Sequence, residues 1–248
     1  MKRICLTLGL VAVSAGLIVP VFAAAPAKVS EIITIEELVA EAKERVAKLG
    51  ESVANEEAFK KALEEKSVGR EGGVLAVTAQ SIVEHSKGKD SGIAGATLRD
   101  AALVLRRTKS FDDAKAAVAK AQEAINGKAD PAAVADHPWA KLTGMHAMMD
   151  EIEIRQQKIR RALAKPRDLP KSSQHAAVIA ILSLAMEEDT HEVKKPEEIP
   201  QWKAWSKEYR ETLAKTAAAM RANKADDASA AFNGSAKICT TCHDKFRD

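Results

Sequence analysis

Helical repeat patterns follow one another along nearly the whole chain, and they limit the fold more than any other feature. The clearest begins at Thr34, which with Glu37 forms the capping-box pattern of a helix N-terminus. Apolar residues then recur on one helix face up to Gly50, at Leu38, Ala42, Val46 and Leu49. Aromatic residues make up only 4% of the chain and alanine is abundant, which favours helix packing over sheet. We therefore predict an all-α protein.

The helical patterns fall into two sets of four. The first set covers residues 34–50, 72–88, 92–110 and 110–127, and the second covers residues 141–164, 172–189, 199–224 and 226–247. The segment between them, "ADPAAVADHP", contains two prolines and no continuing periodicity, which is typical of a linker. The sequence thus predicts two antiparallel four-helix bundles in tandem, at residues 27–130 and 139–248, joined by a linker at 131–138.

The two sets of helices resemble each other in sequence. Residues 109–125 align with 223–239, which places Asp112 on Asp226 and Asp113 on Asp227. Residues 73–84 match 176–187 in position and apolar pattern. We interpret this as a tandem duplication, with a chance match between alanine-rich segments as the alternative. In this alignment Cys239 falls on Ile125, so the first copy lacks the cysteines.

The first 23 residues have the pattern of a secretory signal peptide. Lys2 and Arg3 precede the apolar run "ICLTLGLVAVSAGLIVPVF", which small residues follow, and we expect cleavage after Ala23. An uncleaved membrane anchor is disfavoured because glycine and proline interrupt the run. Cleavage would remove Cys5 and reduce the formal charge from +3 to +1. The remaining charges are interspersed, which argues against a nucleic-acid partner.

The last helical pattern contains the motif Cys239, Thr240, Thr241, Cys242, His243, which is the C-x-x-C-H pattern of covalent haem attachment. Residues at i, i+3 and i+4 share one helix face, so two thiols can reach the two vinyl groups of one porphyrin. The adjacent imidazole of His243 then becomes the proximal iron ligand. Arg247 should lie over the same face. The motif predicts one covalently attached haem c.

Three other interpretations of the motif agree less well with the sequence. A redox-active C-x-x-C pair usually sits in a βαβ context, which this chain lacks. A zinc site needs further ligands at a suitable spacing, and the remaining histidines are scattered, at positions 85, 137, 146, 175 and 191. Of these, His175 starts an apolar helix and is expected to be a solvated end residue. A chance motif is disfavoured because an exported chain would hold only these two cysteines.

A four-helix unit with this motif in its last helix resembles the class II c-type cytochromes, the cytochrome c′ and cytochrome c-556 family. The ending C-x-x-C-H-x-x-[FY]-R of that family is present, with Phe246 and Arg247 in the last two places. "KKPEEIPQWKAW" resembles the proline-then-tryptophan start of the family's third helix. The resemblance covers residues 138–248 well, and residues 27–130 match only as a diverged copy without ligands. It implies a second bundle of cytochrome c′ type.

The resemblance also implies that the first helix of the bundle faces the iron opposite the proximal histidine. The corresponding segment, "GMHAMMDEI", offers Met145 as the best match to the distal ligand, with Met149, Met148 and His146 as alternatives. The competing interpretation is that these methionines only fill gaps in the hydrophobic core. Phe232 is expected to pack near the porphyrin.

The predicted function is electron transfer by a periplasmic monohaem cytochrome with His/Met ligation, acting with redox partner proteins. The alternative is a five-coordinate haem module that binds nitric oxide or carbon monoxide. A third hypothesis makes residues 27–130 an interaction domain. No nucleophile–base pair or acid–base dyad is evident, so an enzyme is not predicted. After cleavage no stable membrane span is expected, and class II bundles often dimerise through their first helices, which makes a homodimer an open alternative.

Overall fold

The computed structural model describes residues 24–134 and 137–247, so the predicted signal peptide lies outside the described residues. Within these ranges the protein is all-α, with nine α-helices and no strand. No helix there is long and apolar enough to cross a membrane. The helices are α1 Ile35–Ser52, α2 Glu56–Glu64, α3 Ser67–Glu84, α4 Gly95–Arg107, α5 Phe111–Ile125, α6 Met145–Ala164, α7 Leu169–Glu188, α8 Ile199–Arg221 and α9 Ala225–Phe246.

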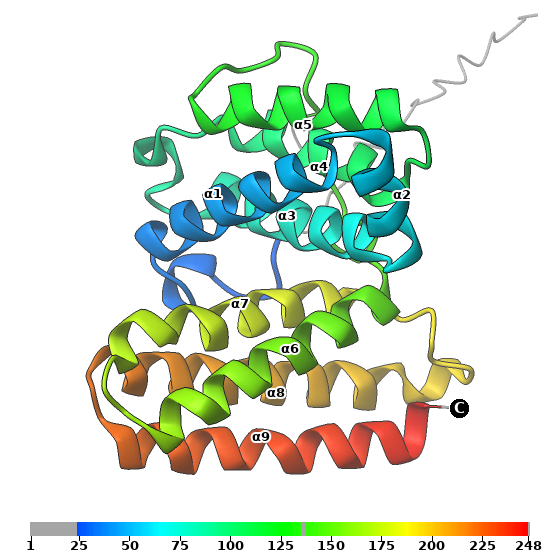
Figure 1. Ribbon diagram of the computed structural model, residues 1–248. Coiled ribbons are helices and arrows are strands. Elements are labelled where there is room, and N and C mark those ends of the chain that lie inside the picture. The colour runs from blue at the N-terminus through cyan, green and yellow to red at the C-terminus, as the bar shows by residue number, and fades with distance from the viewer. Residues whose placement is uncertain (1–23, 135–136, 248) are drawn as a thin grey trace, which may run out of the picture.

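The helices form two stacked groups, with α1 to α5 above and α6 to α9 below in Figure 1. In the first group α1 packs on α3 and α5, and α4 packs between α3 and α5. In the second group α6, α7, α8 and α9 each pack on the next, and α9 returns to α6. The groups meet where α3 packs on α6 and α7. All eight predicted helices are present, with ends shifted by a few residues.

Helix α2 was not predicted. Asn55 caps it by accepting a hydrogen bond from the Ala58 backbone N–H at 2.8 Å, and two glutamates occupy its first turn. Only Phe59 and Ala62 are buried, so the helix adds little apolar surface to the core. By contrast, the capping box at Thr34 is present with both of its hydrogen bonds and begins α1 as predicted.

Helix α3 begins at Ser67, one turn before the predicted start at Gly72. Gly72 and Gly73 are therefore inside the helix and serve close packing. A Cβ on Gly72 would lie 2.7 Å from the Arg106 backbone nitrogen, and one on Gly73 would lie 2.4 Å from Thr143 Oγ1. Glycine at these positions lets α3 approach α4 on one side and the second helix group on the other.

Replacing Gly72 by alanine is expected to destabilise the protein by about 1–3 kcal/mol, because the new Cβ meets the backbone of α4, which cannot move aside cheaply. The matched control is Gly50→Ala in α1, where the Cβ would make only an ordinary 3.6 Å contact with Gln122. That control should gain about 0.5–1 kcal/mol, since alanine is the better helix former. Urea unfolding measures both, and equal stability of the Gly72→Ala and wild-type proteins would contradict the packing argument.

A buried cluster of charged side chains connects the two groups. Glu41 and Arg45 come from α1, Glu71 from α3, and Glu151 and Arg155 from α6. Burial alone would raise the pKa of Glu41, but the neighbouring Arg155 and Arg45 outweigh it and lower that pKa to about 2. Glu41 thus stays charged at neutral pH, and each carboxylate of the cluster is paired with a guanidinium.

His175 of α7 borders this cluster, with Nδ1 3.3 Å from Arg155 Nη1. Burial and the positive charge of Arg155 lower the pKa of His175 to about 4, so the ring is neutral at physiological pH. The expectation of a solvated end residue is wrong, because α7 begins at Leu169, with Pro170 in its first turn, and His175 lies well inside the helix.

Candidate haem-attachment site

The C-x-x-C-H motif lies in the last two turns of α9 (Figure 1). Cys239 and Cys242 are half-buried and His243 is exposed. The three residues share one side of the helix, as their spacing requires. Helix α9 packs mainly on α8 and approaches α6 over a short stretch. One side of the motif helix is therefore anchored while the motif faces the margin of the bundle.

Both thiols are free, and they are not joined in a disulfide. Burial, followed by the neighbouring Cys239, raises the pKa of Cys242 to about 11. A thiol with such a pKa stays protonated at neutral pH, unlike the activated cysteine of a disulfide oxidoreductase. Cys242 is thus poorly suited to rapid thiol exchange.

Cys239 is held by two polar side chains from other helices. Gln156 of α6 donates from Nε2 to Cys239 Sγ at 3.6 Å and to the Tyr209 hydroxyl of α8 at 2.9 Å. Burial and the nearby Cys239 raise the pKa of Tyr209, so the phenol stays neutral. Neither Gln156 nor Tyr209 was predicted as a site residue, because a single glutamine in a charged helix carries no pattern that marks it.

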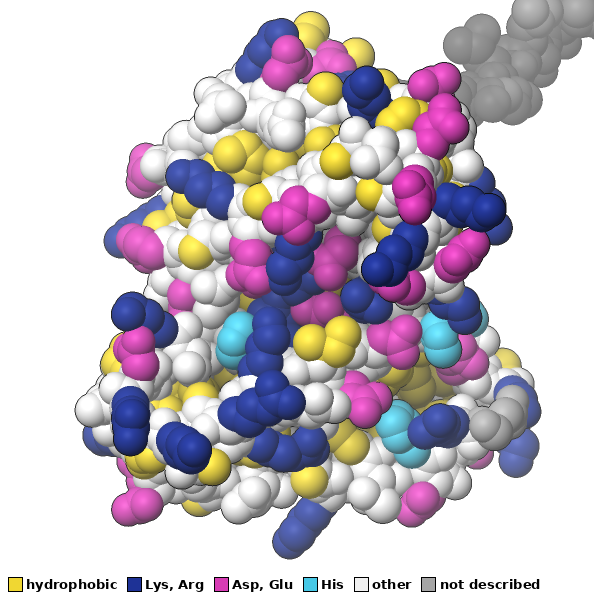
Figure 2. All heavy atoms as spheres, in the orientation of Figure 1, with side chains coloured by type: hydrophobic (Ala, Val, Ile, Leu, Met, Phe, Trp, Pro, Cys, Tyr) yellow, Lys and Arg dark blue, Asp and Glu magenta, His cyan; other side chains and the backbone are white. Residues whose placement is uncertain are grey.

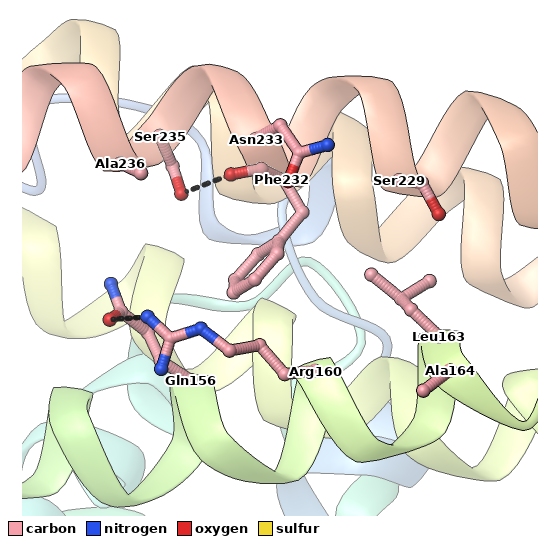
Figure 3. Close-up of a pocket in the computed structure, with 9 residues that line it drawn as sticks. All are labelled: Gln156, Arg160, Leu163, Ala164, Ser229, Phe232, Asn233, Ser235 and Ala236. Carbon is pink, nitrogen blue, oxygen red and sulfur yellow. Dashed lines mark hydrogen bonds between the residues drawn. The ribbon is translucent and has the colours of Figure 1, made fainter.

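A cavity of about 330 Å³ opens between α6 and α9 beside the motif (Figure 3). The α6 wall consists of Gln156, Arg160, Leu163 and Ala164, and the α9 wall consists of Ser229, Phe232, Asn233, Ser235 and Ala236. Figure 3 shows the buried Phe232 ring pointing from α9 towards α6, where the Arg160 guanidinium lies 5.9 Å from its centroid. The cavity combines small α9 residues, one aromatic ring and one cation.

The end of α9 is fixed by aromatic packing. Phe246 stacks edge-on against Trp202 and Trp205 of α8, with ring centroids 5.2 and 5.8 Å apart. Trp202 is buried and donates from Nε1 to the Met186 carbonyl at 2.8 Å. Arg247 follows the last helical residue and is exposed, with its backbone N–H bonded to the His243 carbonyl. Phe246 thus fixes the C-terminal end of the motif helix against α8, and Arg247 lies exposed directly after that helix.

The four candidate distal residues differ in their surroundings. Met148 is fully buried, Met145 is 8% exposed and Met149 is half-buried against the core. His146 is exposed and lies 3.7 Å from Asp150, one turn along the same helix. Met145 and Met149 precede Gln156 by about three and two turns, which puts both on the stripe of α6 that faces α9. Met148 lies off that stripe, and His146 points to solvent.

The contacts between α6 and α9 also define their register. Gln156 meets Cys239, and one turn further along α6 Arg160 meets Phe232, two turns back along α9. The helices are therefore antiparallel. Two turns before Gln156 on α6 correspond to two turns after Cys239 on α9, so Met149 lies level with Phe246, and Met145 lies about one turn further on.

Within the described ranges, no group of three or more His, Cys, Asp and Glu side chains is arranged to hold a metal ion. Comparisons of the chain with protein-family models, curated proteins and solved structures found no match.

Proposed function

We propose that the protein is a monohaem c-type cytochrome that carries its haem on α9 and transfers electrons to and from partner proteins. The observation that carries this proposal is the pair of free, half-buried thiols of Cys239 and Cys242, one turn apart on α9. The imidazole of His243 lies next to them and makes no hydrogen bond or ion pair with the described residues. These residues fit covalent haem attachment. A haem bound there would supply one-electron redox chemistry.

The surrounding residues have roles that follow from their positions. Cys239 and Cys242 would hold the porphyrin edge, and His243 would bind iron from the same helix face. Phe232 offers an apolar wall and Arg160 a positive charge in the adjoining cavity. We assign residues 139–248 to a bundle of cytochrome c′ type and residues 27–130 to a haem-less copy. Periplasmic location remains part of this proposal.

We assign the sixth iron ligand to the Met145–Met149 stripe. Met149 is favoured over Met145, because the helix register places it level with Phe246, less than one turn after His243, and places Met145 about one turn further away. A thioether ligand raises the reduction potential relative to a second imidazole. With both axial positions filled, the iron has no open site, and outer-sphere electron transfer is the chemistry that remains.

One observation favours the alternative function, a five-coordinate haem that binds a diatomic gas. The walls of the cavity between α6 and α9 contain none of the three methionines of α6. An iron facing that cavity would have no methionine ligand on its distal side. Nitric oxide or carbon monoxide would then be the ligand.

Replacing Met149 by alanine decides between these functions. If Met149 binds iron, the ferrous wild type shows a sharp low-spin α band, and the variant changes to a broad high-spin spectrum. Met145→Ala is the matched control on the same stripe, and it should keep the low-spin spectrum. A wild-type spectrum that is already high-spin and unchanged in both variants would support the gas-binding alternative instead.

The surface around the cavity indicates what kind of redox partner would dock. Basic side chains gather over the second half of α6 and the loop after it, at the lower left of Figure 2. These residues are half-buried or exposed, and they are Lys158, Arg160, Arg161, Lys165 and Arg167. A partner with an acidic surface fits this patch, and such association slows as ionic strength rises.

A further inference from the structure

The helices α1 and α6 are equivalent in detail. Each follows a 3-10 turn, Val29–Glu31 before α1 and Trp139–Lys141 before α6. In this alignment Ile35 corresponds to Met145, and the pair Glu41 and Arg45 corresponds to Glu151 and Arg155. From the 3-10 turn to the arginine, the buried positions of one segment are the buried positions of the other.

The last helices of the two groups also correspond. Four of the five buried residues of α5 align with buried residues of α9 in the alignment made from sequence, beginning with Ala114 on Ala228 and Val118 on Phe232. Further along, Ala121 falls on Ser235 and Ala124 on Ile238, and all are buried. The two groups thus bury equivalent positions at both ends.

The charged cluster between the groups is reciprocal. Within each helix the arginine Nε bonds to the glutamate one turn before it, at 2.7 Å in both Arg45–Glu41 and Arg155–Glu151. Across the interface, Arg45 Nη2 pairs with Glu151 and Arg155 Nη2 pairs with Glu41. The same atoms of equivalent residues therefore make the same bonds in both directions, which is the mark of an isologous interface.

A second pair of contacts repeats this reciprocity. Arg221, in the last turn of α8, donates to the Ile32 carbonyl beside the turn before α1. Arg106, in the last turn of α4, donates to the Lys141 carbonyl in the turn before α6. The arginine of each group thus bonds to the turn that begins the other group.

We propose that residues 24–134 serve as a built-in partner subunit for residues 137–247, joined to them through a pseudo-two-fold interface centred on Glu41, Arg45, Glu151 and Arg155. The face of α6 that a second copy would need is covered from within the chain. Helix α9, with its cysteine motif, lies on the far side of the second group and stays open (Figure 1). This role for the haem-less half does not depend on haem.

The test uses the full chain with a protease site placed within residues 131–134 and cut after folding. We expect the two fragments to elute together, at the position of the uncut chain, at low micromolar concentration. All charge variants are made in a Glu71→Gln background, because Glu71 also pairs with Arg45. If the fragments without any charge exchange elute separately under these conditions, the proposal is overturned.

Charge reversal then tests the reciprocity itself. Exchanging both charges on α1 (Glu41→Arg with Arg45→Glu), or both on α6 (Glu151→Arg with Arg155→Glu), keeps the pair within that helix and makes both cross pairs repulsive. Each exchange should weaken association of the fragments at least tenfold and by similar factors, and the four-residue exchange should restore most of it. The proposal fails if the two single-helix exchanges associate as tightly as the four-residue exchange.

A milder variant covers the case in which a charge exchange unfolds a fragment, which circular dichroism would reveal. Gln174 of α7 donates from Nε2 to Glu41 Oε2 at 2.7 Å across the interface. Gln174→Ala should weaken fragment association several-fold, while Arg161→Glu, an exposed change on α6, should leave it unaltered. Equal effects of the two changes would argue against the proposed interface.

Discussion

Replacing Cys239 and Cys242 together by alanine is expected to abolish covalent haem attachment completely. The two thiols are the only cysteine side chains among the described residues, and both are free and half-buried on the motif face of α9. Each single replacement should leave one thioether link and shift the α band of the ferrous protein. Mass spectrometry of the natively matured chain measures the covalent mass, and haem staining after denaturing electrophoresis gives an independent readout.

The matched controls for the cysteine changes lie between the two cysteines. Thr240 and Thr241 are exposed, and each donates its hydroxyl to a carbonyl one turn back in the same helix. Thr240→Ala and Thr241→Ala should therefore retain full haem. A wild-type protein without added mass, or a colourless protein that retains zinc, would contradict the proposed cofactor.

Replacing Arg155 by methionine is expected to lower the free energy of unfolding by about 3–5 kcal/mol. The side chain is fully buried and neutralises Glu41 and Glu151, so its loss leaves buried carboxylates short of one counter-charge. Methionine keeps much of the volume, which limits the effect of a cavity. Chemical unfolding monitored by circular dichroism measures the change.

The control for this prediction is a surface ion pair of the same spacing. Lys48 lies 2.6 Å from Glu44 on α1, and both side chains are about 40% exposed. Lys48→Ala should change stability by at most about 0.5 kcal/mol, because water screens an exposed pair. If Arg155→Met were equally mild, the buried cluster would contribute little to holding the two helix groups together.

Much of the helical architecture is readable from the sequence because its signals are local. The capping box at Thr34 begins α1 as predicted, since a cap depends on residues within one turn. Helix α2 was missed because it exposes most of its residues, and α3 was started too late because Gly72 looked like a boundary. That glycine is needed for contact with α4, and a contact between helices has no signature within one of them.

The candidate site divides in the same way. The positions of Cys239, Cys242 and His243 on one helix face follow from their spacing alone. The contact of Cys239 with Gln156, and the register that brings Met149 level with Phe246, depend on how α6 packs against α9. No periodicity within either helix encodes that register.

The sequence by itself determined the helical class, the approximate positions of eight helices and the placement of the cysteine motif on one helix face, because these depend on neighbours within one or two turns. Only the tertiary structure decided which charges are buried. Glu41 and Arg155 are far apart in the chain and both look like ordinary surface residues of amphipathic helices. They become a paired, desolvated cluster because the packing of the two helix groups removes water from both at once.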